Sequence, residues 1–94
     1  MHYQLSIAEH QINCDHWLSA VFAACIPDGI NNMDGTTGVI ALMKLRFIRS
    51  CIEDQHEALL INNGPVSVES AHRVINGMIL ITIKCPNDEW SVTS

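Results

Sequence analysis

Hydrophobic and polar residues alternate at the start of the chain and then change period. In the segment 3–8 the first, third and fifth residues are large and apolar, the pattern of a strand that buries one face. From Trp17 to Cys25 apolar residues recur every three or four positions. This spacing predicts a helix, which Asn13 or Asp15 can cap.

The segment 39–55 contains no turn residue, and its length favours a second helix. Arg46, Arg49 and Glu53 form a polar stripe at helical spacing. Every second residue from 39 to 47 is also apolar, which leaves a strand as the alternative. We expect a helix.

The residues 78–85, Met-Ile-Leu-Ile-Thr-Ile-Lys-Cys, carry one charge and lie between Asn76-Gly77 and Pro86. A short run rich in β-branched residues between turn residues predicts a buried strand. Asn-Gly is also the strongest short hairpin signal, so 72–75 would pair with 78–81. A short helix over 69–75, capped by Ser67, is the alternative.

Two further segments complete the pattern. Residues 57–61 either end the preceding helix or form a strand that pairs with 66–68 across Asn-Asn-Gly-Pro. Trp90 and Val92 alternate with polar residues in the tail and predict an edge strand.

These elements predict an α+β fold in one small domain spanning 1–94. We expect an N-terminal strand and one or two helices packed on an antiparallel sheet centred on residues 78–85. Residues 28–38 hold three of the five glycines and form the one long loop. Loops of this length in compact domains are often functional.

Composition adds an argument about partners. Hydrophobic residues make up 48% of the 94 and charged residues only 16%, against a typical charged share of about 25%. A small domain has a high surface-to-volume ratio and should need more polar residues, not fewer. The apolar excess predicts an interface with a second copy or a protein partner. Large aromatic residues dominate such interfaces, and the candidates are Trp17, Phe22, Phe47 and Trp90.

The net charge of −5 argues against nucleic acid and anionic lipid as partners, because both are recognised by basic surfaces. No apolar run approaches the roughly 18 residues of a transmembrane helix, and the first residues do not resemble a secretory signal. We therefore expect a cytoplasmic protein whose four cysteines are reduced.

A ligand site is the alternative function. A glycine-rich loop beside a basic cluster can hold an anion or another small molecule at a subunit boundary. Its candidate residues are Asn31, Asn32, Thr36, Thr37, Arg46 and Arg49.

A zinc site is the third hypothesis and is less favoured than the other two. His10, Cys14 and His16 lie within seven residues and are suitable zinc ligands. The chain lacks the closely spaced Cys-x-x-Cys or His-x3–5-His pairs of structural zinc sites, so no cofactor is expected. No nucleophile and base can be paired by spacing. The sequence thus predicts a non-enzymatic binding protein, such as a regulator, an inhibitor or an immunity-type factor, that forms a homo-oligomer.

Overall fold

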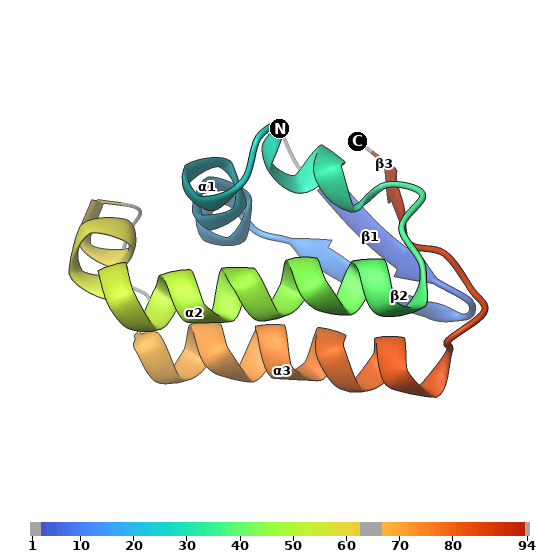
Figure 1. Cartoon of the computed structure of the whole chain (residues 1–94). Coiled ribbons are helices and arrows are strands. Elements are labelled where there is room, and N and C mark those ends of the chain that lie inside the picture. Colours follow the sequence, from blue (N-terminus) through green and yellow to red (C-terminus); the bar gives the residue numbers. More distant parts are fainter. Residues whose placement is uncertain (1–2, 63–66, 94) are drawn as a thin grey trace.

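The computed structural model describes residues 3–62 and 67–93, without the side chains of residues 55–62. Three strands and three α-helices form one α+β domain, which confirms the predicted fold class (Figure 1). The elements in chain order are β1 (Tyr3–Ile7), β2 (His10–Cys14), α1 (His16–Cys25), the 3-10 helix η1 (Gly29–Met33), α2 (Gly38–Asn62), α3 (Val68–Lys84) and β3 (Ser91–Thr93).

The sheet has the strand order β2-β1-β3 and is antiparallel throughout. Leu5, on the central strand, lies opposite Ile12 on β2 and Val92 on β3. Leu5 and Ile7 are buried, as the alternation in the sequence predicts. β1 therefore pairs with the second strand of the chain on one edge and with the last strand on the other. Its apolar face is directed to the helices.

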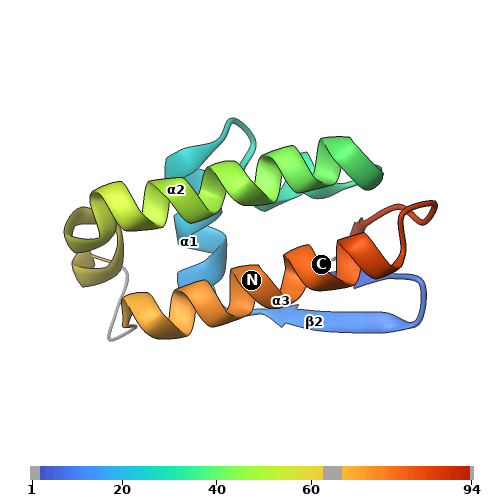
Figure 2. The same cartoon turned by 60° about the horizontal axis from the view of Figure 1, so that its bottom comes forward.

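The helices α2 and α3 lie side by side and antiparallel (Figures 1 and 2). Ala41, Leu45, Ile48 and Ile52 recur every three or four positions of α2 and are fully buried, so they form the side of α2 that faces the core. On another side of α2, Arg49 Nη1 donates to Asn76 Oδ1 of α3 at 3.1 Å.

The predicted strand at 78–85 and the Asn76-Gly77 hairpin are wrong, because this segment belongs to α3. Ser67 caps the helix, with its Oγ accepting a hydrogen bond from Ser70 N at 3.0 Å. Glu69 in the first turn and Lys84 in the last turn also complement the helix dipole. The sheet is centred on β1 instead. The buried residues of α3 follow the helical period: Ala71, Ile75, Met78, Ile79 and Thr82.

The other element predictions are confirmed with adjusted bounds. The N-terminal strand, the helix ending at Cys25 and the edge strand in the tail are all present. Asp15 occupies the N-cap position of α1, although its side chain makes no capping hydrogen bond. The 39–55 helix begins at Gly38 and continues to Asn62, so 57–61 extends it. Residue 66, part of the alternative hairpin, lies outside the described residues.

The tail is held against the 28–38 loop by four contacts. Gly35 N donates to Trp90 O at 2.7 Å, and Trp90 N donates to Thr36 O at 2.9 Å. Val92 N donates to Asp34 Oδ1 at 2.9 Å, and a β-bridge joins residues 37 and 89. The long loop is therefore an ordered connection that positions the start of α2.

Candidate interaction surface

Six large hydrophobic side chains are between 51% and 72% exposed. All six lie on α2 and α3, although both helices already bury another side in the core. We call these six residues the apolar surface: Val39, Ile40, Met43, Phe47, Leu80 and Ile83.

The apolar surface is continuous. Ile40, Met43 and Phe47 are three and four positions apart, so they form one strip along α2. Leu80 and Ile83 are neighbours on α3 by the same spacing. Val39, at the start of α2, and Ile83 of α3 line the same pocket, so exposed residues of the two helices approach each other there.

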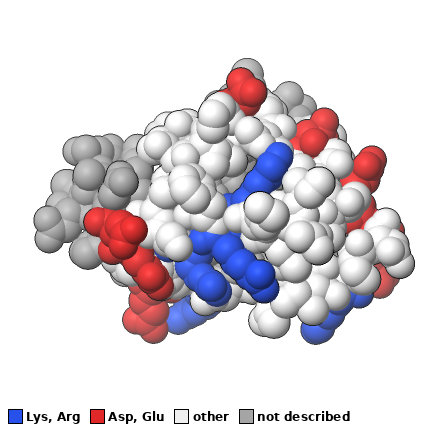
Figure 3. Space-filling model, in the orientation of Figure 1, with Lys and Arg blue, Asp and Glu red and all other residues white. Residues whose placement is uncertain are grey.

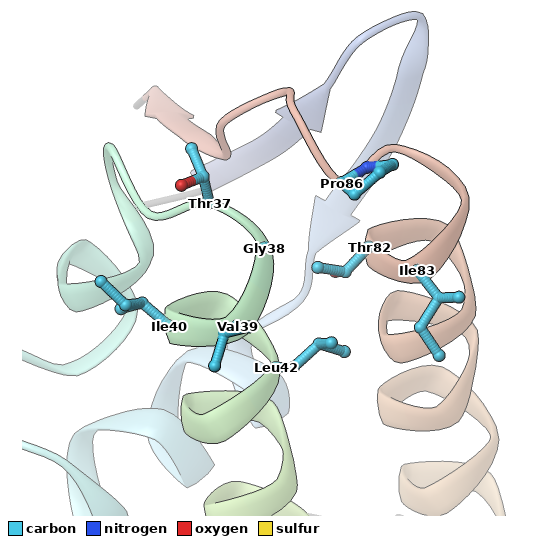
Figure 4. Close-up of a pocket in the computed structure, with 8 residues that line it drawn as sticks. All are labelled: Thr37, Gly38, Val39, Ile40, Leu42, Thr82, Ile83 and Pro86. Atoms are coloured by element: carbon cyan, nitrogen blue, oxygen red, sulfur yellow. The ribbon is translucent and has the colours of Figure 1, made fainter.

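That pocket has a volume of about 520 Å³ and lies where α2 begins and α3 ends (Figure 4). Val39 and Ile40 contribute its lining from α2, and Ile83 contributes from α3. Thr82 also lines it, but the hydroxyl of Thr82 is already bonded within the core. The remaining lining is largely aliphatic, which suits an apolar group more than a charged one.

The basic residues lie on the same two helices as the apolar surface. α2 and α3 carry all five Lys and Arg residues of the chain, whereas six of the ten acidic residues lie outside them. Figure 3 shows the basic side chains gathered over α2 and α3, with acidic side chains around the margins of the view. The five are Lys44, Arg46, Arg49, Arg73 and Lys84.

The four predicted interface aromatics separate into surface and core residues. Phe47 belongs to the apolar surface, and Trp17 is half-buried against the core. Phe22 and Trp90 are fully buried, so neither side chain can contact a partner in this fold. Their large apolar areas contribute to the core instead.

The structure does not bring together the loop and the two arginines of the predicted ligand site. Lys44 Nζ donates to Asn32 O at 2.9 Å and also contacts Asn32 Oδ1, so Lys44 is the cation that faces η1. Arg49 contacts Asn76 of α3. Residues five apart lie on nearly opposite sides of a helix, and Arg46 lies on the side of Arg49.

The loop residues themselves point in different directions. Thr36 is buried and donates its hydroxyl proton to a backbone carbonyl of η1 at 2.6 Å. Thr37 is exposed beside the β-bridge to Glu89. Asn31 lines a second cavity, of about 280 Å³, whose described lining includes Asp28 but no Lys or Arg. That lining is unfavourable for an anion.

The zinc candidates lie along β2 and at the start of α1. His10 and Cys14 occupy opposite ends of β2, about 13 Å apart at the usual rise of a strand. Cys14 is buried, and burial followed by the negative charge of Asp15 raises its pKa to about 11, which opposes the thiolate that zinc requires. Within the described residues, no group of three or more His, Cys, Asp or Glu side chains is placed to hold a metal.

Five members of the apolar surface were missed as interface candidates, because aromatic residues alone were chosen. A signal was present in the sequence. Residues 39–43 and 78–81 are unbroken apolar runs, and a helix cannot turn every residue of such a run towards one core.

Comparisons with known proteins give this surface no precedent. The chain matches no protein-family model, no curated protein and no solved structure. Among the described residues, no helix has both the length and the hydropathy that crossing a bilayer requires.

Proposed function

We propose that this chain is a non-enzymatic binding protein that self-associates through the apolar surface of α2 and α3. The observation that carries the proposal is the exposure of six large hydrophobic side chains on two adjacent helices. Isolated exposed hydrophobic residues are ordinary, but a continuous group of them is typical of an interface.

The size of this surface suits a dimer. Half-exposed side chains of this size present on the order of 100 Å² each, which gives roughly 600 Å² for the six. A standard interface buries roughly 800 Å² on each partner. The aliphatic stems of neighbouring Arg and Lys side chains can supply the remainder. Two-fold dimers are the commonest oligomers of soluble proteins, so a second copy is the proposed partner.

A role as a regulator, inhibitor or immunity-type factor is consistent with binding without catalysis. The proposed location is the cytoplasm, where the four free thiols would remain reduced. The ligand-site alternative receives no support from the positions of Asn32, Lys44 and Arg49.

Sedimentation velocity over a wide concentration range tests the proposal. The unmodified protein should sediment as a dimer of the 10.4 kDa chain. Met43→Lys, in the middle of the α2 strip, should weaken association by at least a hundredfold, because it buries an unpaired charge in the interface.

The matched control is Ala24→Lys, which adds the same charge at an exposed position of α1. It should leave association unchanged. A protein that stays monomeric at all concentrations, or a Met43→Lys variant that associates normally, would contradict the proposal.

A further inference from the structure

The apolar surface includes a strip of three exposed side chains along α2, Ile40, Met43 and Phe47. Phe47 has the only aromatic side chain among its six residues and is 51% exposed. Ile40 lies seven residues, or two helical turns, towards the start of the same helix and is 57% exposed. Met43 occupies the turn between them. Phe47 and Ile40 are therefore on one strip, about 10 Å apart along the axis.

We propose that α2 pairs antiparallel with α2 of a second copy, about a two-fold axis beside Met43, and that each Phe47 packs against Ile40 of the other copy. This inference rests on the proposed self-association and adds its geometry. In a two-fold interface, if residue i of one copy contacts residue j of the other, then j also contacts i. Phe47 then meets Ile40 twice, and the Met43 side chains meet at the axis.

The side chains of the strip suit this contact. Ile40 is aliphatic and well exposed, and aromatic side chains that pack against such residues are typical interface hot spots. The i, i+3, i+7 spacing of Ile40, Met43 and Phe47 is also the spacing with which paired helices interlock.

The charges along α2 permit this pairing. Arg46 and Lys44 flank the apolar strip, at 100° or less on either side of Met43 around the helix. The Lys44 ammonium is already directed to Asn32 of its own chain, and Arg46 is exposed. Both groups can therefore keep their solvent or chain contacts at the rim while the apolar side chains meet in the centre.

A complementation experiment tests the pairing. Phe47→Lys and Ile40→Glu should each be monomeric at concentrations where the unmodified protein is a dimer. Mixed in equal amounts, they should form a heterodimer, because one of its two Phe47–Ile40 contacts is replaced by a Lys–Glu pair and the other is unmodified. We expect the mixture to associate at least tenfold more tightly than either variant alone, measured by native mass spectrometry.

Phe47→Lys mixed with Leu80→Glu is the matched control. Leu80 lies on α3 and is not opposite Phe47 in this pairing, so that mixture should remain monomeric. Circular dichroism of each variant establishes that it is folded. The milder Phe47→Ala and Ile40→Ala serve if a charged variant unfolds, and their effects on dimerisation should be less than additive because both remove one contact.

The outcomes separate the pairing from the proposed function. A dimeric unmodified protein whose Phe47→Lys and Ile40→Glu variants do not complement each other would overturn the pairing and leave self-association standing. An unmodified protein that is monomeric would overturn both the pairing and the self-association. The same conclusion would hold if the monomer used this surface to bind anionic lipid vesicles or an acidic protein.

Discussion

Thr82 connects α3 to the C-terminal tail at the level of single atoms. Its side chain is fully buried, accepts a hydrogen bond from Trp90 Nε1 at 3.0 Å and donates to Met78 O at 2.7 Å. The hydroxyl thus provides the acceptor that the buried indole N–H requires. A threonine on a helix commonly bonds the carbonyl four residues earlier, which leaves its oxygen free to accept the hydrogen bond from the indole.

Thr82→Val should lower the free energy of unfolding by about 1–3 kcal/mol, because the Trp90 N–H then stays buried without an acceptor. Urea unfolding measures this loss. Thr82→Ser keeps the hydroxyl and removes only a methyl group, so it should cost about 1 kcal/mol. Equal losses in the two variants would show that the hydrogen bond contributes nothing.

The thiols of Cys14 and Cys25 should make the free energy of unfolding depend on pH in the alkaline range. Burial raises the pKa of Cys14 to about 11. Burial, together with a hydrogen bond to Cys51, raises the pKa of Cys25 to about 12. The unfolded chain releases these protons near pH 9, whereas the folded chain retains them. Stability should therefore be complete below pH 9 and decline as the pH rises towards 11–12.

Urea unfolding at pH 8, 9 and 10 measures this decline. The double variant Cys14→Ala, Cys25→Ala should show a shallower dependence on pH than the unmodified protein, because two of the titrating groups are gone. Parallel pH profiles would contradict the assignment of the effect to these thiols.

At the scale of elements, α3 is a helix although several of its residues have a low intrinsic preference for helices. Gly77 lies in its middle, and a Cβ at this position would meet no atom within 4 Å. Gly77→Ala should raise the free energy of unfolding by about 0.5–1 kcal/mol, because alanine loses less conformational entropy than glycine in a helix. In the hairpin that Asn76-Gly77 predicts, the same change would be destabilising.

Gly35→Ala is the control for this prediction. Gly35 also has open space around it, but its φ is +79°, a region that alanine rarely adopts. It should destabilise the protein, and thermal unfolding distinguishes the two signs. A destabilising Gly77→Ala would argue against the helix through 68–84.

The sequence predicts most elements correctly because their patterns agree with their surroundings. β1 alternates, and α1 has one apolar side with a stop after Cys25. α3 was mispredicted because the local preference of Ile79, Ile81 and Ile83 for strands is overridden by packing. Its buried side, from Ala71 to Thr82, fits the helical period over the whole length, and this longer pattern outweighs eight residues of local preference.

The sequence predicts that the protein has an interaction surface, but it does not predict which residues form it. Apolar excess indicates an interface, but α2 has apolar residues on two sides. Ala41 and Leu45 face the core, whereas Met43 and Phe47 face outwards. The period of the sequence identifies both strips and does not say which one the sheet and α1 cover. Only tertiary packing decides this, and it likewise places Trp90 in the core.

For the whole molecule, the distribution of charge matters more than its sum. The net charge of −5 describes an acidic protein, yet every Lys and Arg lies on the two helices that carry the apolar surface. These helices also carry four of the ten acidic residues, so the apolar surface is bordered by charged side chains that keep its margins hydrated. A limited assembly such as a dimer is consistent with this border, because its rim can stay in water.

Self-association of this kind should make thermal stability depend on protein concentration. Each tenfold rise in concentration stabilises a dimer by about 1.4 kcal/mol, which corresponds to roughly 3–6 °C in Tm for two chains of this length. Calorimetry at 5, 50 and 500 μM (concentrations chosen on the order of a dimer's expected range) measures the shift. Met43→Lys should remove the dependence, whereas Ala24→Lys should retain it. A Tm of the unmodified protein that is constant over this range would contradict a dimer that assembles as it folds.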